Sequence, residues 1–586
     1  MAFVAIFSLN NSHLHSSPFF PLSEGDIGGG TGVRLIQTPD EIFKSRGEVY
    51  FKFNIPDQSE IKVLTRIISI DDVKGNEVYA YANRNEFNEF LKFHYSFTVL
   101  PPPSTLLKES DLNMGNSQKK DPGNINTVWN FYPTYQQYLD FMAGFANAYP
   151  SICRLDTIGT SVQGRLLLGV KISDSVAFKR SKPEIFYSST IHGDEPLGYV
   201  LLLHLIDYLL SGYGIDTRIT NMINNNQIYI NPLANPDGTY HGGNNTVFGA
   251  TRYNANNADL NRNFPDPQAG LHPDGLAWQP ETVAFMKYAD STRFVESLNF
   301  HGGSEVFNYP WDTWAKLHPD DDWWQFVARE YADTVHAYGP SGYFTELMNG
   351  ITNGYAWYQI TGGRQDYTTY YKYGREATVE MSYVKTPAAS LLLNYWTYQF
   401  HSLLNYIDQA SFGVNGRVTD SVTGNSVYAK IFAAGHDFDN SWVYSKIPSG
   451  WYYRPVDQGS YTLVFSAPNY YSKTIDVSVA RWATTHLNVR LIPLNIGIVN
   501  ETKITTDPFV FPNPSDGIFR IVLPKSSAND YDIQIYNSNG ASIIHQQIRV
   551  NGELFYPMNL TSLPKGIYFI RLTDGHIICQ NKIVLL

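Results

Sequence analysis

The chain has 586 residues, of which 43% are hydrophobic and 17% charged, so it is neither intrinsically disordered nor small enough for a single hydrophobic core. Its formal net charge is −11 and it contains no long basic run, so we expect no nucleic-acid partner. Two cysteines, Cys153 and Cys579, lie far apart and no run of about 18 apolar residues occurs, so we expect neither a disulfide framework nor a transmembrane segment.

The first 126 residues divide into an apolar start, a compact region and a linker. Residues 1–32 begin with a short apolar run that lacks a preceding basic stretch; as written it is no signal peptide, although it could be the remnant of one that starts upstream. Residues 33–100 predict a small α+β domain, either accessory or prosegment-like. A triple proline then opens a polar linker over 101–126. The predicted strands and helix of the α+β domain cover 48–55, 61–70 and 85–93.

Residues 127–410 alternate between short, apolar, β-rich runs and longer helical runs. Such alternation predicts an α/β domain in which helices flank a mixed, largely buried sheet. The predicted strands are 166–172, 184–191, 227–233, 295–301 and 376–383. The predicted helices are 135–148, 199–210, 280–289, 321–338 and 389–407.

Helical patterns end near residue 411. Residues 411–493 carry alternating strands separated by turn residues, which predicts a small β-sandwich. A second all-β domain is predicted over 507–586. The expected fold is therefore an α/β domain preceded by a small α+β segment and followed by two small all-β sandwiches.

Potential metal ligands lie where predicted strands end. His192 and Glu195 follow the strand over 184–191, and their spacing lets both side chains face one point from a strand-to-helix turn; His301 ends the strand over 295–301. Two histidines and one glutamate form a typical catalytic zinc site that leaves a fourth position for water. The His-x-x-Glu string alone is weak evidence. However, ligands of an α/β sheet collect at the carboxyl ends of its strands, where Glu380 also falls.

Longer strings in this region carry a specific resemblance. They are Asn308-Tyr309-Pro310-Trp311-Asp312, Gly350-Ile351-Thr352-Asn353-Gly354, Trp357-Tyr358, Gly362-Gly363 and Gln365-Asp366. Residues 127–410 resemble the zinc metallocarboxypeptidases from end to end, and within them the N/E, or regulatory, subfamily. The resemblance implies one Zn²⁺ ion, held by His192, Glu195 and His301.

The resemblance also implies roles around the metal. Glu380 would be the general base that deprotonates the attacking water and passes the proton to the leaving amine. Arg252 would stabilise the oxyanion. Asn261 and Arg262 would bind the free C-terminal carboxylate of the substrate, since a guanidinium pairs with a carboxylate bidentately. Tyr358 would close over the substrate.

The side-chain specificity has its own expected residues. In the N/E subfamily a carboxylate in the S1′ pocket pairs with a C-terminal Arg or Lys, and Asp312 and Gln365 occupy the matching positions. A buried, unpaired aspartate is costly, so a cationic side chain is its natural partner. Trp311 departs from the Phe expected there, which leaves the pocket's shape less defined than its charge.

Structural roles compete with these assignments. A single histidine is more often structural than a ligand, Glu195 could be a helix N-terminal carboxylate, Asp312 a solvated loop residue and Arg252 a surface residue. Glu376 could be mistaken for the base, but Glu380 fits the family's string.

The flanking regions carry two further resemblances. Residues 411–493 resemble the transthyretin-like sandwich that follows the catalytic domain in the N/E subfamily, where it serves packing. The strings Asn513-Pro514-Ser515-Asp516-Gly517 and Leu563-Pro564-Lys565-Gly566 resemble a type IX secretion C-terminal sorting domain. That resemblance implies handling by the type IX machinery and a secreted or cell-surface location in a Gram-negative bacterium.

We therefore expect a secreted, monomeric zinc carboxypeptidase that removes C-terminal Lys or Arg from peptides. One alternative is a metallocarboxypeptidase of different specificity, acting on aromatic or acidic C-termini or on peptidoglycan peptides. The other is a surface binding protein that keeps the fold without turnover.

Overall fold

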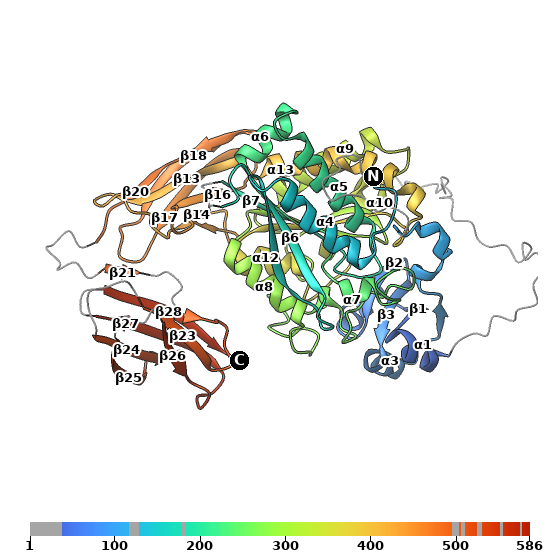
Figure 1. Cartoon of the computed structure of the whole chain (residues 1–586), viewed down its shortest axis with the longest axis horizontal. Coiled ribbons are helices and arrows are strands. Elements are labelled where there is room, and N and C mark those ends of the chain that lie inside the picture. Colours follow the sequence, from blue (N-terminus) through green and yellow to red (C-terminus); the bar gives the residue numbers. More distant parts are fainter. Residues whose placement is uncertain are drawn as a thin grey trace, which may run out of the picture.

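A computed structural model gives the arrangement of the chain (Figure 1). It describes residues 38–115, 128–177, 182–494, 503–505, 510–523, 530–550, 555–574 and 577–586. The predicted start over residues 1–32 and most of the linker's second half lie outside these ranges.

The central α/β domain contains a mixed sheet of eight strands in the order β11-β10-β12-β9-β7-β8-β6-β5. The inner strands β12, β9, β7 and β8 are parallel to one another, whereas β10, β6 and β5 run antiparallel to their inner neighbours. β7, β8 and β9 are buried along their whole length, as parallel strands covered on both faces should be. The strands are β5 Cys153–Thr160, β6 Leu166–Ile172, β7 Glu184–Ser189, β8 Gln227–Asn231, β9 Glu296–His301, β10 Glu305–Tyr309, β11 Ile351–Asn353 and β12 Arg375–Met381.

Helices cover both faces of this sheet. α4 (Tyr135–Ala148), α5 (Leu197–Gly212), α9 (Asp321–Tyr338) and α13 (Leu392–Gln409) share one large apolar core with the sheet. α8 (Pro280–Thr292) and α12 (Arg364–Lys372) pack on the sheet around a second, smaller apolar core. α4 begins where predicted because Thr134 and Gln137 form a capping box. Further helices are α6 Thr217–Asn225, α7 Pro236–Thr239, α10 Glu346–Asn349 and α11 Gly354–Trp357.

Residues 39–100 form an α+β unit with its own apolar core, here called the N-terminal module. Its antiparallel sheet has the order β2-β3-β1-β4. Figure 1 shows it in blue beside the α/β domain. Its elements are α1 Pro39–Arg46, β1 Glu48–Asn54, α2 Ile61–Leu64, β2 Ser69–Lys74, β3 Glu77–Asn83, α3 Arg84–Phe90 and β4 Phe97–Leu100.

One predicted strand is wrong. Residues 61–70 were expected to be extended because they are rich in β-branched side chains, but the segment opens with the helix α2 and only its end joins β2. The buried residues Ile61, Leu64 and Ile68 recur at helical spacing, and burial of that face outweighs the strand propensity.

The region after the α/β domain is all β, as predicted. Two sheets pack around one core. The first has the order β16-β13-β19, with β20 also paired to β13, and the second has the order β15-β14-β17-β18. The strands are β13 Gly413–Asp420, β14 Lys430–Ala433, β15 Val443–Tyr444, β16 Trp451–Arg454, β17 Gly459–Ser466, β18 Lys473–Val479, β19 Thr484–His486 and β20 Val489–Leu491.

A buried ion-pair network joins this sandwich to the α/β domain. The Asp320 carboxylate accepts hydrogen bonds from Arg375 Nη2 at 2.6 Å and from Arg454 Nη2 at 2.8 Å. Arg454 also contacts Asp437 at 2.5 Å. Asp320 and Asp437, with His436, could group around a metal ion, but two guanidinium groups already neutralise these carboxylates.

The C-terminal region contains two further sheets around a separate core, in the orders β21-β28-β27-β24-β25 and β22-β23-β26. Cys579 is buried there, and Cys153 is buried in the α/β domain. Within the described ranges no single helix is long and apolar enough to cross a bilayer; α5 and α6 reach that length only as a pair bent by 103°. The strands are β21 Lys503–Thr505, β22 Val510–Phe511, β23 Ile518–Val522, β24 Asp530–Asn537, β25 Ser542–Arg549, β26 Phe555–Asn559, β27 Gly566–Thr573 and β28 Ile577–Leu585.

Candidate metal centre and substrate cavity

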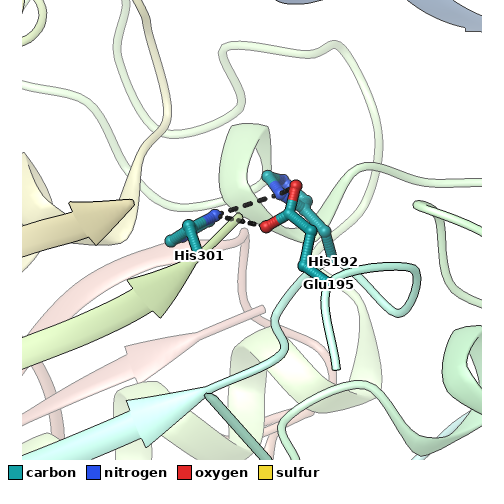
Figure 2. A group of neighbouring side chains, drawn as sticks. All are labelled: His192, Glu195 and His301. Atoms are coloured by element: carbon teal, nitrogen blue, oxygen red, sulfur yellow. Dashed lines mark hydrogen bonds and ion pairs between the residues drawn. The ribbon is translucent and has the colours of Figure 1, made fainter. Parts of the chain in front are cut away.

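The side chains of His192, Glu195 and His301 converge on one buried point (Figure 2). His301 ends β9, and the other two lie in the turn between β7 and α5. Glu195 Oε1 is 3.0 Å from His192 Nδ1, and its Oε2 is 2.9 Å from His301 Nδ1. The two Nδ1 atoms are 3.1 Å apart. Imidazole nitrogens and carboxylate oxygens that converge in this way are the donor set of a catalytic zinc site.

The partners of the two Nε2 atoms are also compatible with a metal bound through Nδ1 of each histidine. His192 Nε2 is 3.2 Å from Asp259 Oδ1, and a carboxylate that accepts from Nε2–H leaves the Nδ1 lone pair for a metal. His301 Nε2 is 2.9 Å from the amide of Asn299, whose Oδ1 is buried without a partner among the described residues. Because the two ends of an amide are nearly isosteric, turning it over supplies His301 Nε2–H with an acceptor. Both rings can therefore present Nδ1 to a shared ion.

The surroundings shift the pKa values of the three ligands in different directions. Burial lowers the pKa of His301 to about 4, so that ring is neutral near pH 7. Burial acts in the same direction on His192, but the nearby carboxylates of Glu195 and Asp259 outweigh it and raise that pKa. Burial opposes the charge of Glu195, yet the two imidazoles and the Lys385 ammonium hold its pKa well below the ordinary value. The site is thus an anionic carboxylate between two imidazoles.

Substitution of Asp259 tests whether this carboxylate supports zinc binding at the metal centre. Replacing it with asparagine is expected to weaken zinc binding about 10- to 100-fold, the usual effect of losing a carboxylate that orients a histidine ligand. Competition with a chromogenic chelator measures the zinc Kd. Asp237→Asn is the matched control, because Asp237 is equally buried but pairs with Arg165 away from the metal. Equal zinc affinity in both variants would show that Asp259 does not support zinc binding.

A cavity of about 30 Å³ adjoins the metal ligands, and its lining includes nearly all the side chains predicted from the sequence. Gln365 lies behind the lining and donates from Nε2 to Asp312 Oδ1 at 3.0 Å. The structure therefore brings together residues from separate strands and loops. Those in the lining are His192, Glu195, Arg252, Asn261, Arg262, His301, Asp312, Tyr358 and Glu380.

Of the two candidate bases, Glu380 alone has an uncommitted oxygen. Its Oε2 is buried without a partner among the described residues. Burial, reinforced by the charge of Glu195, raises its pKa well above the ordinary value. Glu376 instead accepts from Arg364 Nε at 2.8 Å and from the Ser297 hydroxyl at 2.9 Å. Its carboxylate is therefore fully used within the fold.

Three cations, Arg252, Arg262 and Lys385, lie around the cavity. Arg252 Nε is 3.0 Å from Asp259 Oδ2, which orients the guanidinium beside the metal ligands. Lys385 Nζ is 2.6 Å from Glu195 Oε1. Lys385 matched no predicted motif; it follows β12 five residues after Glu380, and a search for cations close to the proposed base would have found it.

The pocket around Asp312 is rich in acceptors. Asp312 Oδ1 accepts from Asn308 Nδ2 at 3.1 Å and from Gln365 Nε2. The carbonyl oxygens of both amides are buried without partners among the described residues. Trp311, which departs from the expected Phe, packs against Trp314 and His318 and is not part of the cavity lining. Asp312 is buried, so it is not the solvated loop residue that was the alternative.

The N-terminal module reaches into the same cavity. Asp71, in β2, belongs to the cavity lining, and Tyr358 packs against the module's apolar core. The sequence did not predict this contact.

Comparison with known proteins identifies two regions of the chain. Residues 138–402 match the zinc carboxypeptidase family, and residues 509–586 match the secretion system C-terminal sorting domain. The chain is 35% identical to human carboxypeptidase D over 384 residues, which are 62% of this chain and 27% of that protein. It therefore spans about a quarter of the length of this relative.

Mouse carboxypeptidase M is matched almost completely. The identity is 33% over 412 residues, covering 65% of this chain and 92% of carboxypeptidase M. The chain belongs to the zinc carboxypeptidase family. Its relatives, which include the mouse carboxypeptidase N catalytic chain at 33% identity, are members of the predicted N/E subfamily. A solved structure, carboxypeptidase A from Helicoverpa armigera, aligns over 62% of this chain and 98% of its own with a TM-score of 0.49 and 16% identity.

Family membership and geometry together confirm two predictions. The zinc carboxypeptidase carries a His192–Glu195–His301 site able to hold one zinc ion. Its C-terminal sorting domain is a type IX secretion tail, which indicates export or display at the cell surface.

Proposed function

We propose that the protein is an exported zinc metallocarboxypeptidase that releases C-terminal Lys or Arg from peptides. The observation that carries the proposal is the shared cavity, which places the metal ligands, Glu380, Arg252, Arg262 and Asp312 within one site. Bound zinc would polarise the scissile carbonyl and acidify a water.

The chain's own residues would supply the remaining chemistry. Glu380 would take the proton from the attacking water and return it to the leaving amine, a role suited to a carboxyl of raised pKa. Arg252, held by Asp259, would face the developing oxyanion. Asn261 and Arg262 would hold the terminal carboxylate, and Tyr358 would shield the site from water.

The acceptors around Asp312 support a basic side chain in the S1′ pocket. A guanidinium or ammonium there would find one carboxylate and the orphaned carbonyl oxygens of Asn308 and Gln365. A phenyl ring would leave the two carbonyl oxygens without a donor and the Asp312 carboxylate without a counter-charge, which is costly.

The pH dependence of specificity follows from Asp312. Burial raises the pKa of Asp312 to about 6, so its charge is present above that pH and lost below it. The ratio of kcat/KM for hippuryl-Arg to that for hippuryl-Phe is expected to fall roughly tenfold from pH 7 to pH 5, because kcat/KM reports groups of the free enzyme. Taking the ratio cancels the titration of Glu380. A ratio that is constant with pH would contradict this role of Asp312.

The flanking domains complete the proposal. The type IX machinery would export the chain through its sorting domain. The 411–493 sandwich would act as a transthyretin-like packing domain, consistent with its buried ion pairs to Asp320. We expect a monomer to suffice, because every proposed catalytic residue comes from one chain.

Parallel assays test the function. Zinc content and hydrolysis of hippuryl-Arg and hippuryl-Phe should be measured on the purified chain before and after limited proteolysis, since the N-terminal module reaches into the cavity. We expect one zinc per chain and preferential hydrolysis of hippuryl-Arg. Preference for hippuryl-Phe would favour a different specificity, and zinc binding without turnover in either form would favour the non-catalytic binding protein.

A further inference from the structure

A second cavity, here called the junction cleft, lies between the α/β domain and the sandwich of residues 411–493 (Figure 1). Its volume is about 140 Å³, which is room for roughly ten water molecules. None of its described lining residues also lines the cavity beside the metal ligands. Cavities that bind small molecules often lie between domains. Five residues of the lining are tyrosines: Tyr371, Tyr373, Tyr428, Tyr444 and Tyr453.

One cation of the junction cleft has no counter-charge. The two lysines of the lining form ion pairs with Asp290 and Glu184. Arg293 has no carboxylate within ion-pair distance among the described residues. Its guanidinium lies instead over the ring of Tyr428, 5.2 Å from the ring centroid. A guanidinium that stacks on an aromatic ring still has in-plane N–H donors for a carboxylate, so Arg293 is available to an anionic ligand.

One tyrosine hydroxyl of the cleft also lacks a partner. Tyr453 is only 7% exposed, and its hydroxyl makes no hydrogen bond to any residue that the structure describes. The adjacent Tyr452, in contrast, donates to the carbonyl oxygen of Leu487 at 2.8 Å. Buried polar groups in folded proteins are nearly always paired. The Tyr453 hydroxyl therefore needs a partner inside the cleft.

Aromatic rings form the walls around these two groups. The rings of Tyr428 and Tyr444 are stacked with their centroids 5.0 Å apart, and Tyr373 contacts Tyr444 edge-on at 4.8 Å. Arg293 and Tyr373 are the C-caps of α8 and α12, and both have left-handed backbones with φ of 58° and 60°. Glycine is the usual residue in this conformation, which is strained for a bulky side chain. Both helices thus end in a strained residue whose side chain lines the cleft.

These features together match one class of ligand. A carboxylate would pair with Arg293, a hydroxyl group would pair with Tyr453, and the C–H face of a sugar ring would pack on the aromatic walls. Inorganic phosphate would leave the walls unused, an aromatic acid would leave Tyr453 unpaired, and a neutral sugar would leave Arg293 unpaired. A hexuronic acid uses all three features. One sugar ring with its substituents also fits a space of roughly ten water molecules.

We propose that the junction cleft binds an acidic sugar, with the sugar's carboxylate on Arg293 and a ring hydroxyl on Tyr453. The ligand is a hexuronic acid, either free or as one residue of an acidic polysaccharide. An exported protein with such a site would be retained on acidic polysaccharide outside the cell. The inference does not depend on the proposed function, because the cleft and the metal cavity have separate linings.

Calorimetry on the purified full chain tests the inference. The probes are D-glucuronate and D-galacturonate, and the comparison ligands are D-glucose, D-galactose, benzoate and inorganic phosphate. We expect one uronate site per chain and at least tenfold weaker binding of each comparison ligand, because each lacks the charge or the hydroxylated ring. If neither uronate binds, or if benzoate or phosphate binds equally well, the proposal is wrong.

A galacturonate trimer distinguishes the two sources of the ligand. Tighter binding of the trimer than of the monomer would support a polysaccharide as the ligand, because neighbouring sugar residues then add contacts. Equal binding of trimer and monomer would support the free sugar acid.

Substitution of Arg293 locates the bound uronate. Arg293→Gln is expected to weaken uronate binding at least tenfold, the usual loss for a hydrogen bond between charged groups. Arg218→Gln is the matched control, since Arg218 pairs with Asp408 and does not line the cleft. Unchanged affinity in Arg293→Gln would place the ligand elsewhere and overturn the proposal.

A pair of tyrosine variants separates binding from folding. Tyr453→Phe is expected to weaken uronate binding about 3- to 10-fold without lowering the melting temperature, because the hydroxyl has no partner among the described residues of the fold. Tyr452→Phe should lower the melting temperature without changing the affinity, since it removes the hydrogen bond to Leu487. Equal uronate affinity in the two variants would show that Tyr453 does not contact the ligand, contrary to the proposal.

Discussion

Replacing Glu380 with glutamine is expected to lower kcat on hippuryl-Arg by roughly 10²- to 10⁴-fold, the usual contribution of a general acid–base. Glutamine keeps the shape of the side chain but cannot accept the proton of the attacking water. Since Glu380 is not one of the three ligands, zinc content should remain at one ion per chain. The measurement is single-substrate kinetics together with metal analysis on the same preparation.

Glu376→Gln separates chemistry from folding. Glu376 lies on the same strand but pairs with Arg364 inside the fold. Its loss should destabilise the protein, by about 3–5 kcal/mol if the guanidinium is left unpaired, while the folded fraction keeps its turnover. Full activity in Glu380→Gln, or a larger catalytic loss in Glu376→Gln, would show that the base is misassigned.

Replacing Asp312 with asparagine is expected to reduce kcat/KM for hippuryl-Arg about 30- to 5,000-fold. This range corresponds to the roughly 2–5 kcal/mol lost when one partner of a buried charge pair is removed. Hydrolysis of hippuryl-Phe should change little, because a phenyl ring makes no ion pair. The measured quantity is the ratio of kcat/KM for the two substrates, which cancels any loss of active protein.

Asp366→Asn is the neighbouring control for Asp312. Asp366 is buried in the same region, but its carboxylate accepts from the backbone N–H groups of Asp312 and Thr313. Its replacement should lower the melting temperature without shifting the substrate ratio. A specificity change in Asp366→Asn, and none in Asp312→Asn, would place the S1′ determinant elsewhere.

The metal centre could be predicted from the sequence because its ligands lie at the ends of predicted strands. His192 follows β7 and His301 ends β9, and the parallel pairing of these two strands brings their carboxyl ends together. The limits of α4, β6 and α9 were also predicted correctly, because an apolar run marks β6 and helical patterns mark α4 and α9. α2 was missed because β-branched residues hid a helical spacing of buried side chains.

The contact between the N-terminal module and the cavity could not be predicted from the sequence. Asp71 stands in Ile70-Asp71-Asp72, where local pattern does not distinguish a buried carboxylate from a solvated one. Its partners Arg252 and Lys385 lie far along the chain, and only tertiary packing brings them to β2. The same holds for Lys385, which belongs to no periodic or spaced motif. Long-range pairings between charged side chains leave no trace in composition or periodicity.

The most direct test of the central claim is mass spectrometry of the products formed from peptides that end in Arg, Lys, Phe or Glu. The zinc-loaded chain, before and after limited proteolysis, is incubated with each peptide with and without a chelator. We predict loss of a single residue from the Arg and Lys peptides, abolished by the chelator and restored by zinc. Internal cleavage, chelator-insensitive trimming, or equal trimming of the Phe and Glu peptides would contradict the assignment of a zinc carboxypeptidase specific for basic C-termini.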